Sequence, residues 1–147
     1  MQTIKVAIVD DHRIFRDGII ATLEGVPSIQ IVGDVASGDA LLQLLQAQDV
    51  NVVLMDLHMP VKNGIEVTRE VKAKFPDVKI LINTMSELTN EIANAVAAGV
   101  NGYVLKTSGP DELIKALQMV AHGTNYFSPA VLDNFIKGTG NKSADEK

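Results

Sequence analysis

The chain has 147 residues, of which 46% are hydrophobic, with a formal net charge of −5 and no cysteine. This length suits one domain with a proper core and is short for two. The composition excludes disulfides, thiolate metal sites and cysteine nucleophiles, and the acidic charge excludes a broad basic surface for nucleic acid.

Five short apolar segments predict the strands of one sheet. They cover residues 4–10, 29–36, 51–56, 78–84 and 102–106. Each is followed by a segment whose apolar residues recur at helical spacing, within residues 12–23, 41–45, 65–71, 88–98 and 113–120. Ser37 and Pro110 are typical of a helix start, and Gly99 is typical of a helix end.

The pattern changes behind these five units. Residues 124–137 predict one short extra helix, which Ser128 and Pro129 begin. Residues 138–147 are rich in glycine and charge and show no periodicity, so we expect a linker or flexible tail there. Residues 1–123 therefore make up the main domain.

A strand followed by a helix, five times over, predicts an α/β fold with a parallel sheet covered by helices on both faces. Five units are too few for an eight-stranded barrel. We therefore expect a flavodoxin-like, doubly wound sheet of five strands in the order 2-1-3-4-5. Ligands of such sheets bind beyond the carboxyl ends of the strands.

Polar residues stand at the carboxyl ends of four of the five predicted strands. Asp10 and Asp11 follow the first strand, Asp56 ends the third, Thr84 ends the fourth and Lys106 ends the fifth. Neighbouring strands lie about 4.8 Å apart, so the three carboxylates would share one crevice. Crowded carboxylates favour binding of a divalent cation, and oxygen ligands alone suit Mg²⁺ best.

Each of these residues also has an ordinary interpretation. Asp10 or Asp11 could serve only as a helix N-cap, and Asp56 could serve only as a turn former. Thr84 could be an ordinary strand hydroxyl and Lys106 an ordinary surface charge. Their joint position at one edge of one sheet favours a reactive site, in which a carboxylate beside a cation can attack phosphorus.

Four motifs occur in order along the chain: VDDH at residues 9–12, MDLHMPVKNG at 55–64, NT at 83–84 and GYVLK at 102–106. Together they resemble the receiver domain of two-component response regulators, over about residues 3–122. The segments DDHRIFRDGI, AAGVNGYVLK and AHGTNYFSP are similar to the NarL/FixJ-like subclass, which carries a LuxR-type helix-turn-helix behind the receiver.

The resemblance implies a phosphorylation switch. Asp56 would accept a phosphoryl group from a phosphohistidine of a sensor histidine kinase. Asp11, Asp56 and the main-chain carbonyl of His58 would bind Mg²⁺, and Asp10 would have an indirect or assisting part, through the ion or a water.

The resemblance also implies how phosphorylation changes the surface. Lys106 and Thr84 would contact the phosphoryl group, and movement of Thr84 would let Tyr103 turn inward. The alternative for Tyr103 is a plain strand aromatic with its hydroxyl at the surface. His12 and His122 show no metal spacing, and we assign neither a catalytic role.

We expect the output to be a surface and not the turnover of a substrate, beyond self-catalysed phosphoryl acceptance and hydrolysis. A magnesium-dependent phosphohydrolase would need a second carboxylate two residues after its nucleophile, where His58 stands. A stand-alone receiver, acting as a phosphorelay or protein-interaction module, stays open. We favour the interpretation that this chain is a piece of a longer transcription regulator. That regulator would bind DNA only through an output domain outside this chain, and it could form a homodimer on phosphorylation.

The location of the protein is a further expectation. The apolar runs are strand-sized, and the N-terminal segment MQTIKVAIVDD contains no apolar signal core. We therefore expect a cytoplasmic protein without a membrane partner.

Overall fold

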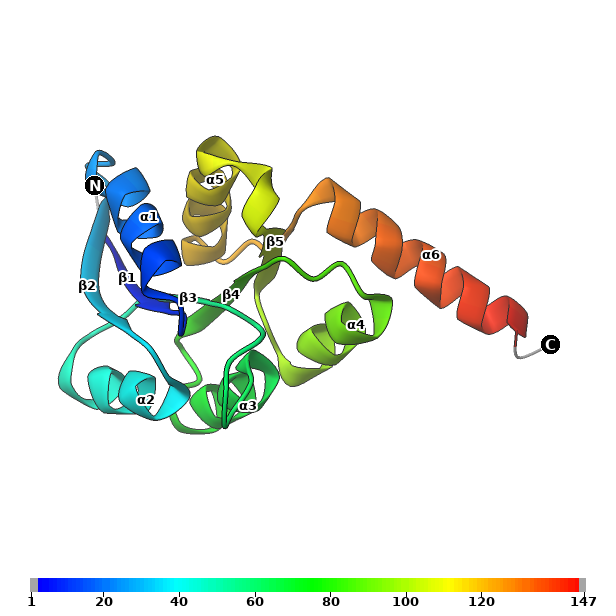
Figure 1. The fold of residues 1–147 in the computed structure, drawn as a ribbon, viewed down its shortest axis with the longest axis horizontal. Coiled ribbons are helices and arrows are strands. Elements are labelled where there is room, and N and C mark those ends of the chain that lie inside the picture. The colour runs from blue at the N-terminus through cyan, green and yellow to red at the C-terminus, as the bar shows by residue number, and fades with distance from the viewer. Residues whose placement is uncertain (1–2, 146–147) are drawn as a thin grey trace.

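The computed structural model describes residues 3–145, which form one parallel sheet covered by helices (Figure 1). The strands are β1 (Ile4–Val9), β2 (Ile29–Val35), β3 (Val52–Met55), β4 (Lys79–Thr84), β5 (Gly102–Leu105) and β6 (Tyr126–Phe127). The helices are α1 (Arg13–Glu24), α2 (Gly38–Ala47), α3 (Gly64–Lys74), α4 (Thr89–Ala98), α5 (Pro110–Ala121) and α6 (Pro129–Asp145), with a short 3₁₀ turn η1 (Lys106–Ser108).

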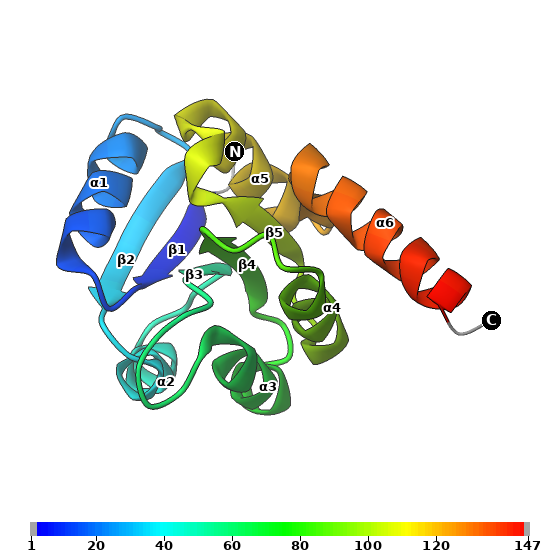
Figure 2. The same cartoon turned by 45° about the vertical axis from the view of Figure 1, so that its right-hand side comes forward.

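The strand order is β2-β1-β3-β4-β5-β6, and all the pairs are parallel. The α/β class and the order 2-1-3-4-5 are therefore confirmed. Helices α1 and α5 lie together on one face of the sheet, and α2, α3 and α4 lie on the other (Figures 1 and 2). In the part of the chain that the structure describes, none of the helices is long and apolar enough to cross a membrane.

The sheet has a sixth strand that the sequence did not predict. Strand β6 pairs Tyr126 with Gly102 and Phe127 with Tyr103. Gly102 allows this approach, because a Cβ there would lie 2.6 Å from the carbonyl oxygen of Tyr126. A two-residue strand carries no measurable alternation, so only the tertiary structure identifies it.

Helix α6 is longer than the sequence predicted. It begins at Pro129, as Ser128 and Pro129 indicated, but runs to Asp145, where we expected a linker from residue 138. The last two residues of that expected linker lie outside the described residues. The glycines at 138 and 140 lower helix propensity, but backbone hydrogen bonds continue a helix once it has begun.

The core has two apolar layers, one on each face of the sheet. On one face, strand residues pack against Leu23 of α1 and Leu117 of α5. On the other, they pack against Leu41 of α2, Val67 of α3 and Ile92 of α4. The four residues of β3 are all buried, since helices cover both faces of this central strand. This double cover fixes the strands and so fixes the residues at their ends.

The predicted helix boundaries hold where a cap defines them. Ser37 accepts a hydrogen bond from the N–H of Ala40 at the start of α2. Gly99 ends α4 in the left-handed conformation, with a φ of 103°. Pro110 is the first residue of α5. Lys106 lies just past β5, in the first position of η1, so a change of backbone direction begins at this residue.

Candidate functional site

The carboxyl ends of β1, β3, β4 and β5 bring the polar residues singled out in the sequence to one edge of the sheet. Asp10, Asp56 and Thr84 are buried, and each is at most 6% exposed. Buried carboxylates need partners, because an isolated charge in an apolar interior is costly. Their partners therefore define the site.

Strand register places the two buried carboxylates side by side. Val9 of β1 is paired with Met55 of β3, and the N–H of Asp56 donates to the carbonyl of Val9 at 3.0 Å. Asp10 and Asp56 each follow one of these paired residues. The prediction that the first and third strands are neighbours is thus confirmed, and it is the reason that the carboxylates meet.

Lys106 contacts both carboxylates from the end of β5, two strands away from β3 and three away from β1. Its Nζ lies 2.7 Å from Oδ2 of Asp10 and 3.3 Å from Oδ2 of Asp56, and its side chain is only 8% exposed. The same ammonium lies 4.0 Å from the centroid of the Phe15 ring, a cation–π distance. Lys106 is therefore a buried cation held between the carboxylates of Asp10 and Asp56 and not a surface charge.

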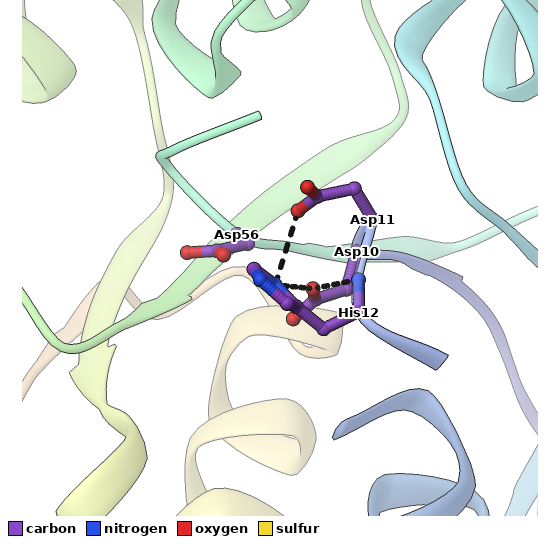
Figure 3. A group of neighbouring side chains, drawn as sticks. All are labelled: Asp10, Asp11, His12 and Asp56. Carbon is purple, nitrogen blue, oxygen red and sulfur yellow. Dashed lines mark hydrogen bonds and ion pairs between the residues drawn. The ribbon is translucent and has the colours of Figure 1, made fainter. Parts of the chain in front are cut away.

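A cluster of Asp10, Asp11, His12 and Asp56 could hold a metal ion (Figure 3). Each residue offers one ligand atom, and these atoms all lie within 4.8 Å of one another. Among the side chains described for residues 3–137, Oδ1 of Asp11 is the buried oxygen that makes no hydrogen bond, although Nδ1 of His12 lies 3.2 Å from it. Three carboxylates, one of which has an oxygen without a hydrogen bond, are a donor set that fits a hard cation such as Mg²⁺.

His12 bounds this cluster on its exposed side. Its Nδ1 lies 3.3 Å from Oδ1 of Asp10 and 3.2 Å from Oδ1 of Asp11. His12 is also the N-cap residue of α1, and its N–H donates to Oδ1 of Asp10 at 2.8 Å. Neither Asp10 nor Asp11 is the N-cap residue of α1, because that position is occupied by His12.

The turn after Asp56 is held tightly against the strand. The N–H of Gly64 donates to the carbonyl of Leu57 at 2.7 Å, and a Cβ on Gly64 would lie 2.6 Å from the carbonyl oxygen of Asp56. Asn63 and Glu66 form a complete capping box at the start of α3. Asp56 therefore precedes the cap of α3 by several residues, and its carboxylate is free for the site.

Thr84 ends β4, and Tyr103 belongs to the neighbouring strand β5. Thr84 is 1% exposed, and its Oγ1 accepts from the N–H of Ser86 at 3.5 Å. Tyr103 is fully buried, and its hydroxyl donates to the carbonyl of Ser86 at 2.9 Å. Burial raises the pKa of Tyr103 to about 12. The alternative of a strand aromatic with its hydroxyl at the surface is therefore wrong.

His58 lies at the rim of the site, with its side chain 60% exposed. Its Nε2 lies 2.9 Å from Oε2 of Glu91 in the first turn of α4. Glu91 also accepts a short hydrogen bond from the hydroxyl of Ser86. The expected part of His58, its main-chain carbonyl as a metal ligand, stays a prediction.

A hollow of about 500 Å³ lies beside Asp56. Its lining includes the buried or nearly buried residues Asp56, Thr84 and Lys106, and also His12, Phe15, His58, Met85, Ser86, Glu87, Leu88 and Glu91. A small phosphorylated group therefore has room beside the carboxylate of Asp56.

Sequence reasoning missed three residues of this site. Phe15 supports Lys106, and Arg16 donates through Nη1 to the main-chain carbonyl of Asp10 at 2.6 Å. Glu91 joins His58 to Ser86. Phe15 fits the apolar spacing of a helix and Glu91 is compatible with an ordinary acid in a first helical turn, so nothing in the sequence marked their contacts across the fold.

Comparison with known proteins gives one family. Its sequence model, described as the response regulator receiver domain, matches residues 6–118. The transcriptional regulatory protein DegU of Brevibacillus brevis is 36% identical over 134 residues, which are 91% of this chain and 57% of DegU. The response regulator GacA of Pseudomonas aeruginosa is 36% identical over 128 residues, which are 87% of this chain and 60% of GacA.

Solved structures agree with these sequence matches. A LuxR-family two-component response regulator from Aurantimonas sp. SI85-9A1 has a TM-score of 0.89 and 31% identity, covering 94% of this chain and 99% of that one. The isolated REC domain of RcsB from Salmonella enterica serovar Typhimurium, in the presence of phosphomimetic BeF3⁻, has a TM-score of 0.84 and 29% identity over 90% and 99% of the two chains. This chain thus spans the whole of both structures and about 60% of the two curated relatives.

Proposed function

We propose, on the premise that this chain belongs to the family of response regulator receiver domains, that it is a switch controlled by phosphorylation of Asp56. The observation that carries this proposal is the contact of Lys106 Nζ with the carboxylates of both Asp10 and Asp56. A buried ammonium between two carboxylates at strand ends is an arrangement that can receive a phosphoryl group.

The proposed reaction is a transfer from a phosphohistidine of a sensor histidine kinase. An oxygen of the Asp56 carboxylate attacks phosphorus, the P–N bond to the imidazole breaks, and its electron pair returns to the imidazole nitrogen. The product is an aspartyl phosphate. Hydrolysis later restores the carboxylate and releases inorganic phosphate.

Lys106 and Thr84 would hold the phosphoryl group once it is formed. Lys106 already lies at the acceptor oxygen, so its ammonium can exchange part of its contact with Asp56 for a phosphoryl oxygen. Thr84 is buried on the neighbouring strand and has a hydroxyl proton to donate. These two donors stabilise the added negative charge.

Asp11, Asp56 and the main-chain carbonyl of His58 would hold Mg²⁺, with Asp10 assisting. Oδ1 of Asp11 supports this assignment, since it is buried and accepts no hydrogen bond, with only Nδ1 of His12 at 3.2 Å beside it. When bound, the cation supplies positive charge that neutralises phosphoryl oxygens. Asp10 also keeps Lys106 in place, since its Oδ2 is the closer of the two carboxylate contacts of that ammonium.

Tyr103 would carry the change to the surface. Its hydroxyl contacts the carbonyl of Ser86, two residues after Thr84, so a movement of Thr84 toward a phosphoryl group pulls on the segment that holds Tyr103. A buried aromatic with two packing positions can serve as a bistable element. Its inward position supports a role in the switch.

The output is a surface rather than a turnover reaction. A phosphohydrolase with Asp56 as nucleophile would need an acid two residues later, and His58 occupies that position with its ring turned to Glu91. We therefore propose that the chain catalyses only its own phosphorylation and dephosphorylation.

In a full-length regulator this chain would control a DNA-binding output domain. DegU is a transcriptional regulatory protein, and RcsB has been solved as dimers bound to DNA. By analogy we propose a phosphorylation-dependent homodimer that binds DNA through the output domain, in the cytoplasm. A stand-alone receiver acting as a phosphorelay or protein-interaction module is the alternative.

Labelling with a small phosphodonor tests this function. The protein is incubated with radiolabelled acetyl phosphate, with and without Mg²⁺, and acid-labile phosphate is measured. We expect labelling only with Mg²⁺, and none in Asp56→Asn. Asp49→Asn, an exposed aspartate at the opposite end of the sheet, is the matched control and should label like the wild type. Equal labelling of wild type and Asp56→Asn would overturn the proposal.

A further inference from the structure

Strand β2 carries none of the residues assigned to the reaction, yet two of its residues hold the end of β1. The N–H of Asp10 donates to the carbonyl of Val35 at 3.1 Å. The residue before Val35 is Asp34, whose Oδ2 accepts from Nε of Arg16 at 3.1 Å. Nη1 of Arg16 in turn donates to the main-chain carbonyl of Asp10 at 2.6 Å. Both main-chain polar groups of Asp10 are therefore held from β2, one directly and one through Arg16.

The guanidinium of Arg16 is itself fixed in direction. Its side chain is 13% exposed, and that of its partner Asp34 is 39% exposed. A guanidinium is planar and its N–H donors point in fixed directions, so the bond from Nε to Asp34 also sets the direction of Nη1. Bonds between an ionised donor and a carboxylate are among the stronger hydrogen bonds of proteins. Arg16 therefore presents a fixed donor to the end of β1.

The bond to the carbonyl of Asp10 acts on Asp11 as well. A peptide unit is planar, so the carbonyl of Asp10 lies in one plane with the main-chain nitrogen and Cα of Asp11. When Arg16 fixes the direction of this carbonyl, it limits rotation of the whole plane. It thereby sets the direction in which the side chain of Asp11 leaves the main chain.

The two acids differ in what holds their carboxylates. Oδ2 of Asp10 lies 2.7 Å from Nζ of Lys106, and its Oδ1 accepts from the N–H of His12. Oδ1 of Asp11 is buried and makes no hydrogen bond, with only Nδ1 of His12 at 3.2 Å beside it. Its carboxylate nevertheless turns toward the other side chains of the cluster (Figure 3). Because a buried oxygen without a hydrogen bond is costly, the main chain must hold Asp11 in this position.

We propose that Arg16 is a positioning residue which, held by Asp34, fixes the peptide between Asp10 and Asp11 and so keeps the carboxylate of Asp11 in place for Mg²⁺. This inference rests on the proposed function, in which Asp11 binds that cation. A ligand that is already in its binding position loses less conformational freedom when the cation arrives, so the affinity is higher. Arg16 acts through the main chain and does not itself bind the cation.

Binding of Mg²⁺ to the unphosphorylated protein tests this role. MgCl₂ is titrated into the wild type and Arg16→Met, and isothermal titration calorimetry gives the Kd. Residues that orient metal ligands typically contribute about 10- to 100-fold to metal affinity, and we expect the Kd of Arg16→Met to rise about tenfold. Arg16→Lys keeps the charge but has no planar fork, so its Kd should lie between those of wild type and Arg16→Met.

Lys72→Met is the matched control for a purely structural effect. Nζ of Lys72 donates to the main-chain carbonyl of Val78 at 3.0 Å and to Oδ1 of Asn101 at 2.8 Å. Lys72 thus resembles Arg16, since each is a cation that bonds to one main-chain carbonyl and one side-chain oxygen of other segments. Val78 directly precedes β4, at the opposite end of the sheet from the site. We expect both methionine variants to lose thermal stability, but only Arg16→Met to change the Kd for Mg²⁺.

Arg13→Met is the control for charge alone. Arg13 lies in the same helix, its side chain is 84% exposed, and it lies 3.8 Å from Asp17. Its removal takes one positive charge from the neighbourhood of the acids without breaking the bond to the carbonyl of Asp10. We expect its Kd for Mg²⁺ to stay close to that of the wild type, because exposed charges interact weakly. An equal rise in Arg13→Met and Arg16→Met would overturn the proposal.

A double-mutant cycle tests whether Arg16 depends on Asp34. Asp34→Ala should also raise the Kd, and adding it to Arg16→Met should raise the Kd by much less than the product of the two single effects. Asp34 is partly exposed, so Asp34→Ala carries the same test if Arg16→Met fails to fold.

The outcomes separate this inference from the proposed function. If the wild type binds Mg²⁺ and takes label on Asp56, an unchanged Kd in Arg16→Met and Asp34→Ala would overturn the role of Arg16 and leave Asp56 as the acceptor. Fully multiplicative effects of the two substitutions would overturn the part of Asp34. A wild type that binds no Mg²⁺ would overturn both the inference and the proposed function.

Discussion

Helices α3 and α4 begin beside the same site, but they begin in opposite ways. The start of α3 is closed by a complete capping box between Asn63 and Glu66, and Gly64 is pressed against the carbonyl of Asp56. The N-cap of α4 is Leu88, whose side chain is 60% exposed and cannot accept a hydrogen bond. The first-turn acid of α4, Glu91, contacts two loops instead.

This difference indicates a division of tasks. The capping box of α3 satisfies the N–H groups of Asn63 and Glu66, and the turn before it packs against the main chain of Asp56. The start of α4 has no side-chain cap, and its first-turn acid, Glu91, contacts His58 and Ser86 in the loops around the hollow. An element with fewer local bonds opens at lower free energy, so we expect the start of α4 to open more readily than the start of α3.

Gly64→Ala breaks the fixed side and should have the largest effect. The added Cβ would lie 2.6 Å from the Asp56 carbonyl oxygen and 3.0 Å from Cα of Leu57, and these are backbone atoms that cannot rotate away. We expect a loss of about 2 to 3 kcal/mol in the free energy of unfolding. Chemical denaturation measures it.

Gly18→Ala is the control for this substitution, because a Cβ at Gly18 in α1 would meet no atom within 4 Å. Alanine favours a helix interior, so Gly18→Ala should gain up to about 1 kcal/mol. Equal and small effects at both glycines would show that the turn at Gly64 is not tightly held.

High pH should lower the free energy of unfolding through Tyr103, whose hydroxyl bonds to the loop before α4. Burial raises the pKa of Tyr103 from its ordinary 10.0 to about 12, so between these two pH values the folded state keeps a proton that the unfolded state has lost. The stability contributed by the neutral tyrosine is therefore complete below pH 10 and is lost as the pH rises toward 12. We expect this loss to be on the order of 2 kcal/mol.

Unfolding of wild type and Tyr103→Phe across this pH range measures the effect of that one group, since all other titrations are common to both proteins. The wild type should lose more stability than Tyr103→Phe as the pH rises. Parallel curves would contradict the burial of the hydroxyl and its bond to Ser86.

Exchanging the caps sharpens the comparison and should give the smallest effects. Asn63→Ala removes the cap of α3 and should cost about 1 kcal/mol, whereas Leu88→Asn adds a cap to α4 and should gain about half as much. Thermal unfolding of both variants measures these changes. If Leu88→Asn destabilises the protein and Asn63→Ala does not, the two helix starts do not differ as described.

The sequence by itself determined the fold class, the neighbouring positions of the first and third strands, and the residues at the strand ends. Apolar periodicity specifies strands and helices locally, and parallel strands necessarily present their carboxyl ends at one edge of the sheet. Asp10, Asp56, Thr84 and Lys106 therefore come together in the structure as expected. The caps at Ser37 and Gly99 were readable for the same reason, since each acts within its own helix.

Only the tertiary structure decided the contacts between residues that are distant in the chain. Strand β6 depends on the missing Cβ of Gly102, which allows a two-residue segment to approach β5. The inward position of Tyr103 depends on packing and on the carbonyl of Ser86. In the sequence Glu91 is an ordinary first-turn acid, and only the folded structure places the loop carrying His58 against it. Local patterns encode periodicity and caps, but they do not encode which side chains meet across loops, because those contacts depend on how the whole core packs.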